Sequence, residues 1–182
     1  MMKFYIARIS LLSLLMLTAA PVALAANTAT VTISATVLAD CSVTVNQSVL
    51  DIGRIAVSEL HDKAKNAALD GMVGSVDVTS KCGDSTRAKL TVSTQTVADK
   101  SIVASSPSGV EADVMRFGLK IDDKAADFDD ASKSVTSEIN DENLSSDGHK
   151  DTLTFSGLAG ANSGKATAGS YSATVTVKVE PE

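Results

Sequence analysis

Residues Ala29–Val37 read ATVTISATV, an unbroken alternation of apolar and hydroxyl-bearing side chains. Successive side chains of a β-strand point to opposite faces, so this pattern predicts a strand with one apolar face and one hydroxyl face. Ala29, Val31, Ile33, Ala35 and Val37 form the apolar face. Such a strand can complete its own domain or pair with a neighbouring molecule, and the alternation alone leaves both options open.

The stretch before this strand has the features of a secretory signal peptide. Lys3 and Arg8 give a positive start, a short apolar run follows, and Ala23-Leu24-Ala25 is a small-x-small cleavage site. The alternative is a membrane anchor, but the apolar run is short for crossing a bilayer. We therefore expect residues 1–25 to be removed during export.

The composition argues against several classes of function. The formal net charge is −6, and no cluster of lysine and arginine is present, which argues against binding to nucleic acid or anionic lipid. The chain has no tryptophan and only 3% aromatic residues, so it offers no platform for stacking bases.

Two cysteines, Cys41 and Cys82, follow the predicted export signal. In an exported protein such a pair predicts one disulfide. The loop it closes has about forty residues, for which the chain-entropy estimate is roughly 3–4 kcal/mol. The alternative, a metal-binding or nucleophilic pair, is disfavoured because neither histidine is adjacent to a cysteine.

Alternating stretches recur along the rest of the chain, separated by turn-forming residues. Their predicted inward side chains are Val43 and Val45; Leu50 and Ile52; Val76 and Val78; Ala88, Leu90 and Val92; Met115, Phe117, Leu119 and Ile121; and Tyr171, Ala173, Val175, Val177 and Val179. Further short strands are predicted around Val135 and over Thr152–Phe155, and Glu59–Asp70 is expected to be a helical turn or a loop. Seven or eight short strands without a long helix indicate an all-β antiparallel sandwich or barrel.

Two finer expectations concern neighbouring strands. Gly83–Thr86 has the composition of a turn, which predicts a hairpin between the strands that end at Cys82 and begin near Ala88. Arg116 and Lys120 alternate with the apolar residues around them, so both are predicted to face outward.

With these features together, the chain resembles the fimbrial subunits (pilins) of the chaperone–usher pathway of Gram-negative bacteria. The resemblance rests on the alternating extension Thr28–Val37 after a signal peptide, Cys41 leading into Leu50-Asp51-Ile52-Gly53, Cys82 at the end of a strand, and the final run Gly169–Val177. Gly169 is the fourteenth residue from the C-terminus, as in the family. Pro181 departs from the pattern, since many members have a tyrosine at that position.

The resemblance implies a single immunoglobulin-like antiparallel β-sandwich over residues 39–182 that lacks its last strand. A periplasmic chaperone first fills the resulting groove, and a donor strand, residues 26–38 of the next subunit, then replaces it. The donor strand would insert Val31, Ile33, Ala35 and Val37. The acceptor groove and chaperone-facing strands would present Val43, Val45, Gly169, Tyr171, Ala173, Val175, Val177 and Val179.

No catalytic constellation can be assembled from the sequence, and no enzyme activity or cofactor is expected. His61 and His149 stand in polar stretches and are expected to be solvated. Asp122, Asp123, Asp127, Asp129 and Asp130 surround Phe128, and their spacing lacks the central glycine and closing glutamate of a calcium loop. We therefore expect a solvated acidic loop and no metal site.

The resemblance favours a structural subunit of a surface fimbria, exported through the periplasm, that polymerises by donor-strand exchange and supports cell adhesion. Its implied partners are a periplasmic chaperone, an outer-membrane usher and other pilus subunits. The alternative is a fimbrial adhesin or secreted β-sandwich module that recognises a host ligand without polymerising. The variable region Asp99–Lys150 is then the expected binding surface.

Overall fold

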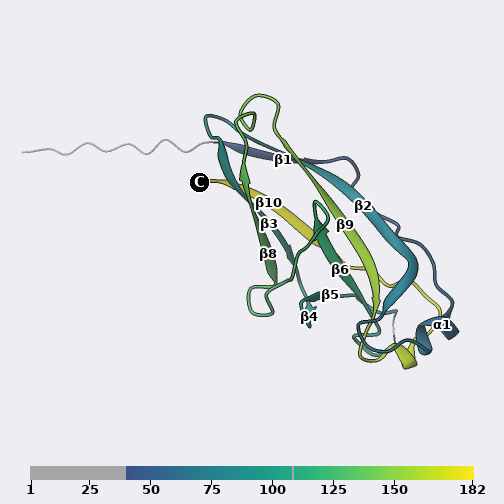
Figure 1. Cartoon of the computed structure of the whole chain (residues 1–182). Helices are drawn as coiled ribbons and strands as arrows, with labels where there is room; N and C mark the ends of the chain where they lie inside the picture. Colours follow the sequence, from purple (N-terminus) through teal and green to yellow (C-terminus); the bar gives the residue numbers. More distant parts are fainter. Residues whose placement is uncertain (1–39, 108) are drawn as a thin grey trace, which may run out of the picture. The chain divides into compact units, whose positions relative to one another are not determined.

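The computed structural model describes residues 40–107 and 109–182 (Figure 1). The predicted signal peptide and donor strand lie outside the described residues. Within these residues the chain forms the elements β1 (Cys41–Val45), α1 (Val57–His61), β2 (Ala68–Cys82), β3 (Arg87–Thr94), β4 (Val97–Ala98), β5 (Ser101–Val103), β6 (Met115–Ile121), β7 (Lys124–Ala125), β8 (Ser134–Asn140), β9 (His149–Ala159), the 3-10 turn η1 (Ser163–Lys165) and β10 (Val175–Pro181).

The strands form two antiparallel sheets. The large sheet has the order β1-β2-β9-β6-β5-β4, with β7 paired to β6, and the small sheet has the order β10-β3-β8. All of the strand pairs are antiparallel. The predicted all-β antiparallel sandwich is therefore confirmed.

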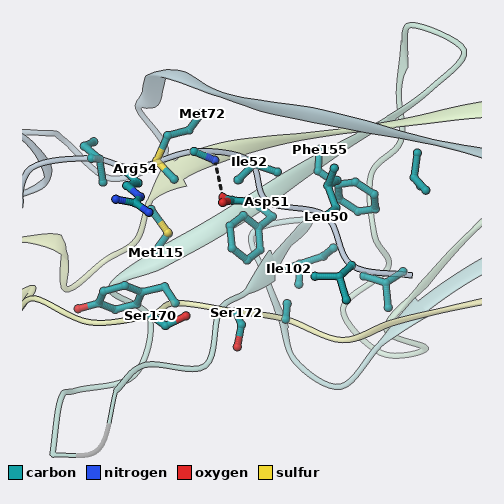
Figure 2. A pocket seen from close by; sticks show the side chains of 18 of the residues that line it. Leu50, Asp51, Ile52, Arg54, Met72, Ile102, Met115, Phe155, Ser170 and Ser172 are labelled. Carbon is teal, nitrogen blue, oxygen red and sulfur yellow. Dashed lines mark hydrogen bonds between the residues drawn. The ribbon is translucent and has the colours of Figure 1, made fainter. Parts of the chain in front are cut away.

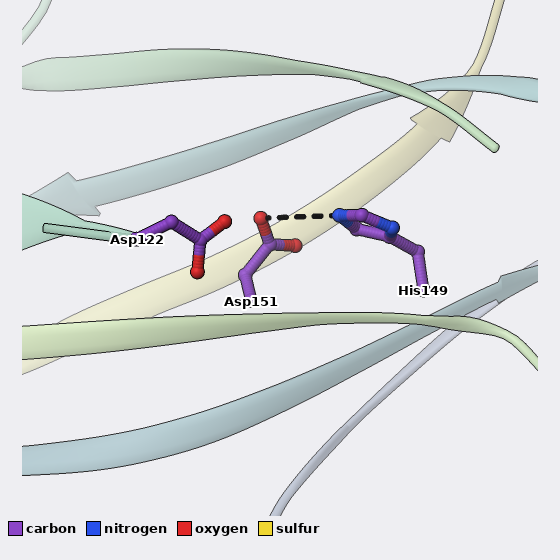
Figure 3. Close-up of side chains that lie close together, drawn as sticks. All are labelled: Asp122, His149 and Asp151. Carbon is purple, nitrogen blue, oxygen red and sulfur yellow. Dashed lines mark ion pairs between the residues drawn. The ribbon is translucent and has the colours of Figure 1, made fainter. Parts of the chain in front are cut away.

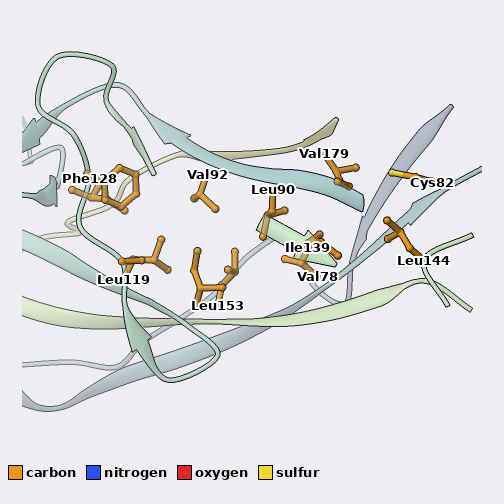
Figure 4. Close-up of a cluster of buried hydrophobic side chains, with 14 residues drawn as sticks. Val78, Cys82, Leu90, Val92, Leu119, Phe128, Ile139, Leu144, Leu153 and Val179 are labelled. Atoms are coloured by element: carbon orange, nitrogen blue, oxygen red, sulfur yellow. The ribbon is translucent and has the colours of Figure 1, made fainter. Parts of the chain in front are cut away.

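The core lies between the inner faces of the two sheets, as Figure 4 shows. Ala88, Leu90 and Val92 alternate along β3 and have no exposed surface, as their spacing predicts. Val78 of β2 and Leu153 of β9 are equally buried on the large sheet. The period-2 pattern thus fixes which side chains enter the core, because a shift of one residue would move them all into water.

The predicted hairpin between β2 and β3 is wrong. Both edges of β2 are occupied in the large sheet, by β1 and β9, whereas β3 lies in the small sheet between β10 and β8. The turn at Gly83–Thr86 therefore carries the chain from one sheet to the other. Alternation defines the inward face of a strand but not the strand beside it, which explains the error.

The predicted strand at Leu50 and Ile52 is also wrong. The Asn46 N–H donates to the Asp77 carbonyl, and its side-chain oxygen accepts from the Asp77 N–H. After this exchange residues 47–56 run beside β2 without forming a ladder. One further bond, from Gln47 Nε2 to the Ser75 carbonyl, keeps the segment against the sheet.

Several other elements differ in extent from the expectations. Strand β9 has 11 residues where only Thr152–Phe155 were predicted, and β10 begins at Val175 rather than at Tyr171. The expected strand near Val135 is β8. The region Glu59–Asp70 overlaps helix α1, and none of the helices in the described ranges is long and apolar enough to cross a membrane.

Candidate functional site

The two sheets have free edges on the same side of the sandwich. Strand β1 pairs only with β2, and β10 pairs only with β3, within the part of the chain that the structure describes. Strands β1 and β10 are in contact with each other. A free strand edge presents unpaired N–H and C=O groups to any further strand.

An apolar groove of about 1290 Å³ opens between these edges. Residues 47–57 form one wall and residues 166–177 form the other, while the floor comes from side chains of β2, β5, β6 and β9. Figure 2 shows Leu50 and Ile52 on one side of the groove and Ser170 and Ser172 on the other. Within residues 40–107 and 109–182, the groove therefore lies where the small sheet has no strand beyond β10 to cover the large sheet.

The floor is a part of the hydrophobic core that the sandwich leaves partly uncovered. Val76, Phe117 and Phe155 are half-buried and pack against the fully buried core residues. Val45 retains 44% of its surface exposed. Covering a side chain of this kind contributes roughly 1.5–3 kcal/mol, so the groove offers substantial binding energy to an apolar strand.

Hydrogen bonds hold both walls in place. The Gly53 N–H donates to the Asp51 carboxylate over 3.0 Å, which stabilises the turn after Ile52. On the opposite wall the Tyr171 hydroxyl accepts from the Thr167 N–H and donates to the Thr167 carbonyl, at 3.1 and 3.0 Å. Residues 47–56 and 166–174 of the walls are therefore locally anchored chain outside the named strands, whereas residues 175–177 of the second wall belong to β10.

Gly169 lies in the second wall and packs tightly against the Pro107 ring. A Cβ atom at this position would collide with the ring carbons, so only glycine permits this approach. Backbone bonds between Ser105 and Ser172, at 2.7 and 3.3 Å, hold the same two segments together. The glycine noted from its place in the sequence thus has a local packing role at the groove.

The structure brings most of the predicted acceptor residues together. The predicted acceptor residues that line the groove are Val43, Val45, Gly169, Tyr171, Ala173, Val175 and Val177. Val179 does not line it, since it is 9% exposed and packs in the core of the sandwich. The predicted donor residues Val31, Ile33, Ala35 and Val37 lie outside the described residues.

Other residues of the groove were not singled out as acceptor positions. They are Leu50, Ile52, Met72, Ile102, Met115, Phe117, Leu153 and Phe155, among others. Several of them were correctly predicted to face inward. This inward orientation was the one feature of the sequence that could have identified them as groove residues. Which inward residues remain uncovered depends on the opposite sheet, and alternation carries no information on that.

The predicted disulfide is present between Cys41 and Cys82. The two residues face each other directly in the β1–β2 register, with their Cα atoms 4.0 Å apart. The bond fixes the start of β1, and so one end of the groove, to the end of β2.

Two carboxylates of the acidic stretch, those of Asp127 and Asp129, have partners within the protein. Phe128 is buried, Asp127 pairs with Lys100 over 2.9 Å, and the Asp129 carboxylate accepts from the backbone of Ser132 and Ala131. These hydrogen bonds, with that from Ser132 largest, lower the pKa of Asp129 below its ordinary value.

His61 is exposed, as expected, and ends α1 with Nε2 2.8 Å from the Ala166 carbonyl oxygen. His149 is not in the expected solvated loop, because it begins β9 and is half-buried. His149 stands close to Asp122 and to Asp151 of β9. Burial raises the pKa of Asp151 above its ordinary value, and the negative charge of Asp122 acts in the same direction.

Comparison with solved structures shows which known proteins have a similar fold. The P pilus rod subunit PapA superposes with a TM-score of 0.50 at 16% sequence identity, covering 85% of this chain and 100% of that chain. A chain from a chaperone–usher pilus gives a TM-score of 0.45 at 16% identity, covering 86% of this chain and 97% of that chain. No protein-family model and no curated protein matches the sequence. The described chain thus has the β-sandwich fold of the P pilus rod subunit.

Proposed function

We propose that this protein is a structural subunit of a surface pilus that polymerises by donor-strand exchange. Residues 26–38 of one copy would enter the groove of the next. The observation that carries the proposal is the free edge of β10 beside an apolar groove. The fold shared with the PapA rod subunit supports it.

The physical fit between strand and groove is direct. An inserted strand would pair its backbone with the free edge of β10, while alternate side chains enter the groove. Val31, Ile33 and Val37 would then lie against the half-buried floor, each contributing roughly 1.5–3 kcal/mol. Donor strand and groove are different surfaces of one chain, so the contact does not close on itself and repetition produces a fibre.

The proposed role implies two further partners. Before assembly its apolar floor is exposed, and a periplasmic chaperone that lends a strand would protect it from aggregation. An outer-membrane usher would then exchange that strand for the donor strand of the next subunit. The finished pilus stands on the cell surface, where it supports adhesion.

The test compares the full chain with a variant that lacks residues 26–38, each co-produced with a candidate pilus chaperone. Size-exclusion chromatography reports the assembly state. The full chain is expected to form a ladder of oligomers, and the deletion variant to remain monomeric or chaperone-bound. Two substitutions sharpen the comparison: Ile33→Asp changes the apolar face and should prevent assembly, whereas Thr32→Asp changes the hydroxyl face and should preserve it.

A stable monomer of the full chain that unfolds on deletion would contradict the proposal. In that case residues 26–38 complete their own sandwich. The protein would then be a self-contained adhesin or secreted binding module.

A further inference from the structure

Three potential metal ligands meet where the β6–β7 turn reaches the start of β9. Asp122 lies in the turn, and His149 and Asp151 lie on β9 with one residue between them. One ligand atom from each lies within 4.8 Å of the other two. Figure 3 shows the Asp151 carboxylate between the Asp122 carboxylate and the His149 ring.

Asp151 is an unusual member of this group because it is buried without adequate partners. The residue is 2% exposed, and its Oδ2 atom has no hydrogen-bond partner. Its Oδ1 atom lies 3.6 Å from His149 Nε2, too far for a hydrogen bond. A buried carboxylate in this condition is costly unless a proton or a cation compensates it.

A second unsatisfied oxygen lies on the neighbouring strand, two positions away in the register. Ser80 on β2 faces His149 directly in the β2–β9 register, and it is fully buried with no partner for its Oγ atom. Among the described residues, Ser80 Oγ and Asp151 Oδ2 are the buried side-chain atoms that lack any hydrogen bond. Ser80 lies on β2 and Asp151 lies on β9, the strand beside it. The two buried oxygens without a hydrogen bond are therefore in the same part of the large sheet.

The ring of His149 is also oriented as expected for a histidine that binds a metal ion. Its Nδ1 atom is 2.8 Å from Asp141 Oδ2, and since an ionised carboxylate only accepts, Nδ1–H is the donor. The other ring nitrogen, Nε2, lies on the side of Asp151 and is therefore the one available to a metal ion. Metal-binding histidines usually donate their other ring N–H to a carboxylate in this way. Asp141 is itself held by the Asn143 N–H at 2.8 Å.

Asp122 is the exposed end of the group. Its Oδ1 atom accepts from the Thr152 N–H over 2.8 Å, and its own N–H donates to the Thr152 carbonyl over 3.0 Å. The carboxylate is therefore tied to β9 but remains open to solvent. Burial thus increases from Asp122 through His149 to Asp151, which gives an ion a path from solvent.

We propose that Asp122, His149 and Asp151 bind a divalent transition-metal ion such as Zn²⁺. One imidazole nitrogen and two carboxylate oxygens suit zinc, with solvent in a fourth position. Calcium needs six to eight oxygens, and magnesium prefers oxygen ligands in octahedral geometry, so the donor set favours a transition metal. Metal–ligand bonds of about 2.0–2.2 Å require the ligand atoms to approach by roughly 1 Å, a movement that the exposed turn of Asp122 permits.

The test is a calorimetric titration of the untagged, metal-free full chain with Zn²⁺. One saturable site per chain is expected. Asp151→Asn and His149→Gln should abolish it, and Asp141→Asn should weaken binding by roughly 10- to 100-fold through the orientation of His149. Matched controls are Asp123→Asn, the next residue of the same turn, and His61→Gln, the other histidine; both should bind like the wild type.

Folding is checked separately from binding. Without metal, Asp151→Asn should be at least as stable as the wild type, because the substitution removes an unpaired buried charge. Added Zn²⁺ should raise the melting temperature of the wild type and of both controls only. The proposal is overturned if no saturable binding occurs at micromolar Zn²⁺, if Asp151→Asn still binds, or if His61→Gln removes the site. The first result would mean that a proton shared between Asp122 and Asp151 compensates the buried charge.

Discussion

Arg116 and Asp113 form a two-bonded ion pair, although the sequence pattern predicts that Arg116 faces solvent. Arg116 Nε lies 2.5 Å from Asp113 Oδ1 and Nη2 lies 2.6 Å from Oδ2. The guanidinium is only 2% exposed and also donates to Asp99 and to Asn66 Oδ1. These contacts make Arg116 a link between β6 and the loops around it, including the segments that carry Asn66 and Asp99.

Asp113→Asn should destabilise the protein by about 3 kcal/mol or more, because it leaves the buried guanidinium without its main anionic partner. Asparagine keeps the shape of the side chain and tolerates the positive φ of 62° at this position. Urea unfolding measures the loss. Asp84→Asn is the matched control, since Asp84 is exposed and has a similar φ of 56°. Equal stability of the two variants would show that the ion pair contributes little.

The lowered pKa of Asp99 predicts that the protein loses stability at acid pH. Hydrogen bonds from Lys65 and Arg116 lower the pKa of Asp99 to about 2. Because this folded-state pKa lies below the unfolded value of roughly 3.9, the stabilisation is complete above about pH 4 and is lost as the pH falls toward 2. Melting curves of the wild type and Asp99→Asn between pH 2 and pH 7 should therefore differ at neutral pH and converge at low pH. A constant difference across this range would contradict the assignment.

The disulfide should contribute measurably to stability. Replacing Cys41 and Cys82 together by alanine should cost roughly 3–4 kcal/mol, since the bond closes a 41-residue separation in the unfolded chain. Thermal unfolding measures the total loss, and hydrogen exchange should show the earliest opening in β1. Exchange that is unchanged in β1 would mean that pairing with β2 holds this edge strand without the bond.

Substitutions in β10 can distinguish an effect on the groove from an effect on folding. Val177→Asp places a charge in the groove and should prevent assembly of the proposed pilus while the subunit still folds with its disulfide. Lys178→Asp introduces the same side chain on the exposed face and should leave assembly intact. The measurement is the oligomer ladder on size-exclusion chromatography. Assembly that survives Val177→Asp would contradict the role of this groove.

Local patterns in the sequence predicted much of the core. Ala88, Leu90 and Val92 alternate, and all three are buried, because a strand places every second side chain on one face. The cysteines also predicted their own pairing, since the chain contains only two. Alternation depends on residues close together in the chain, and the disulfide followed from the number of cysteines.

Local patterns in the chain were sufficient to predict the all-β class, most inward faces of the strands and the disulfide, whereas the way these parts pack together depends on the complete fold. The tertiary structure placed β2 and β3 in different sheets, buried Arg116 against Asp113, and left the floor of the groove uncovered beside β10. It also brought Asp122 to His149 and Asp151. The physical reason is that alternation fixes the face of a side chain, while strand partners and buried charge pairs depend on contacts between residues far apart in the chain.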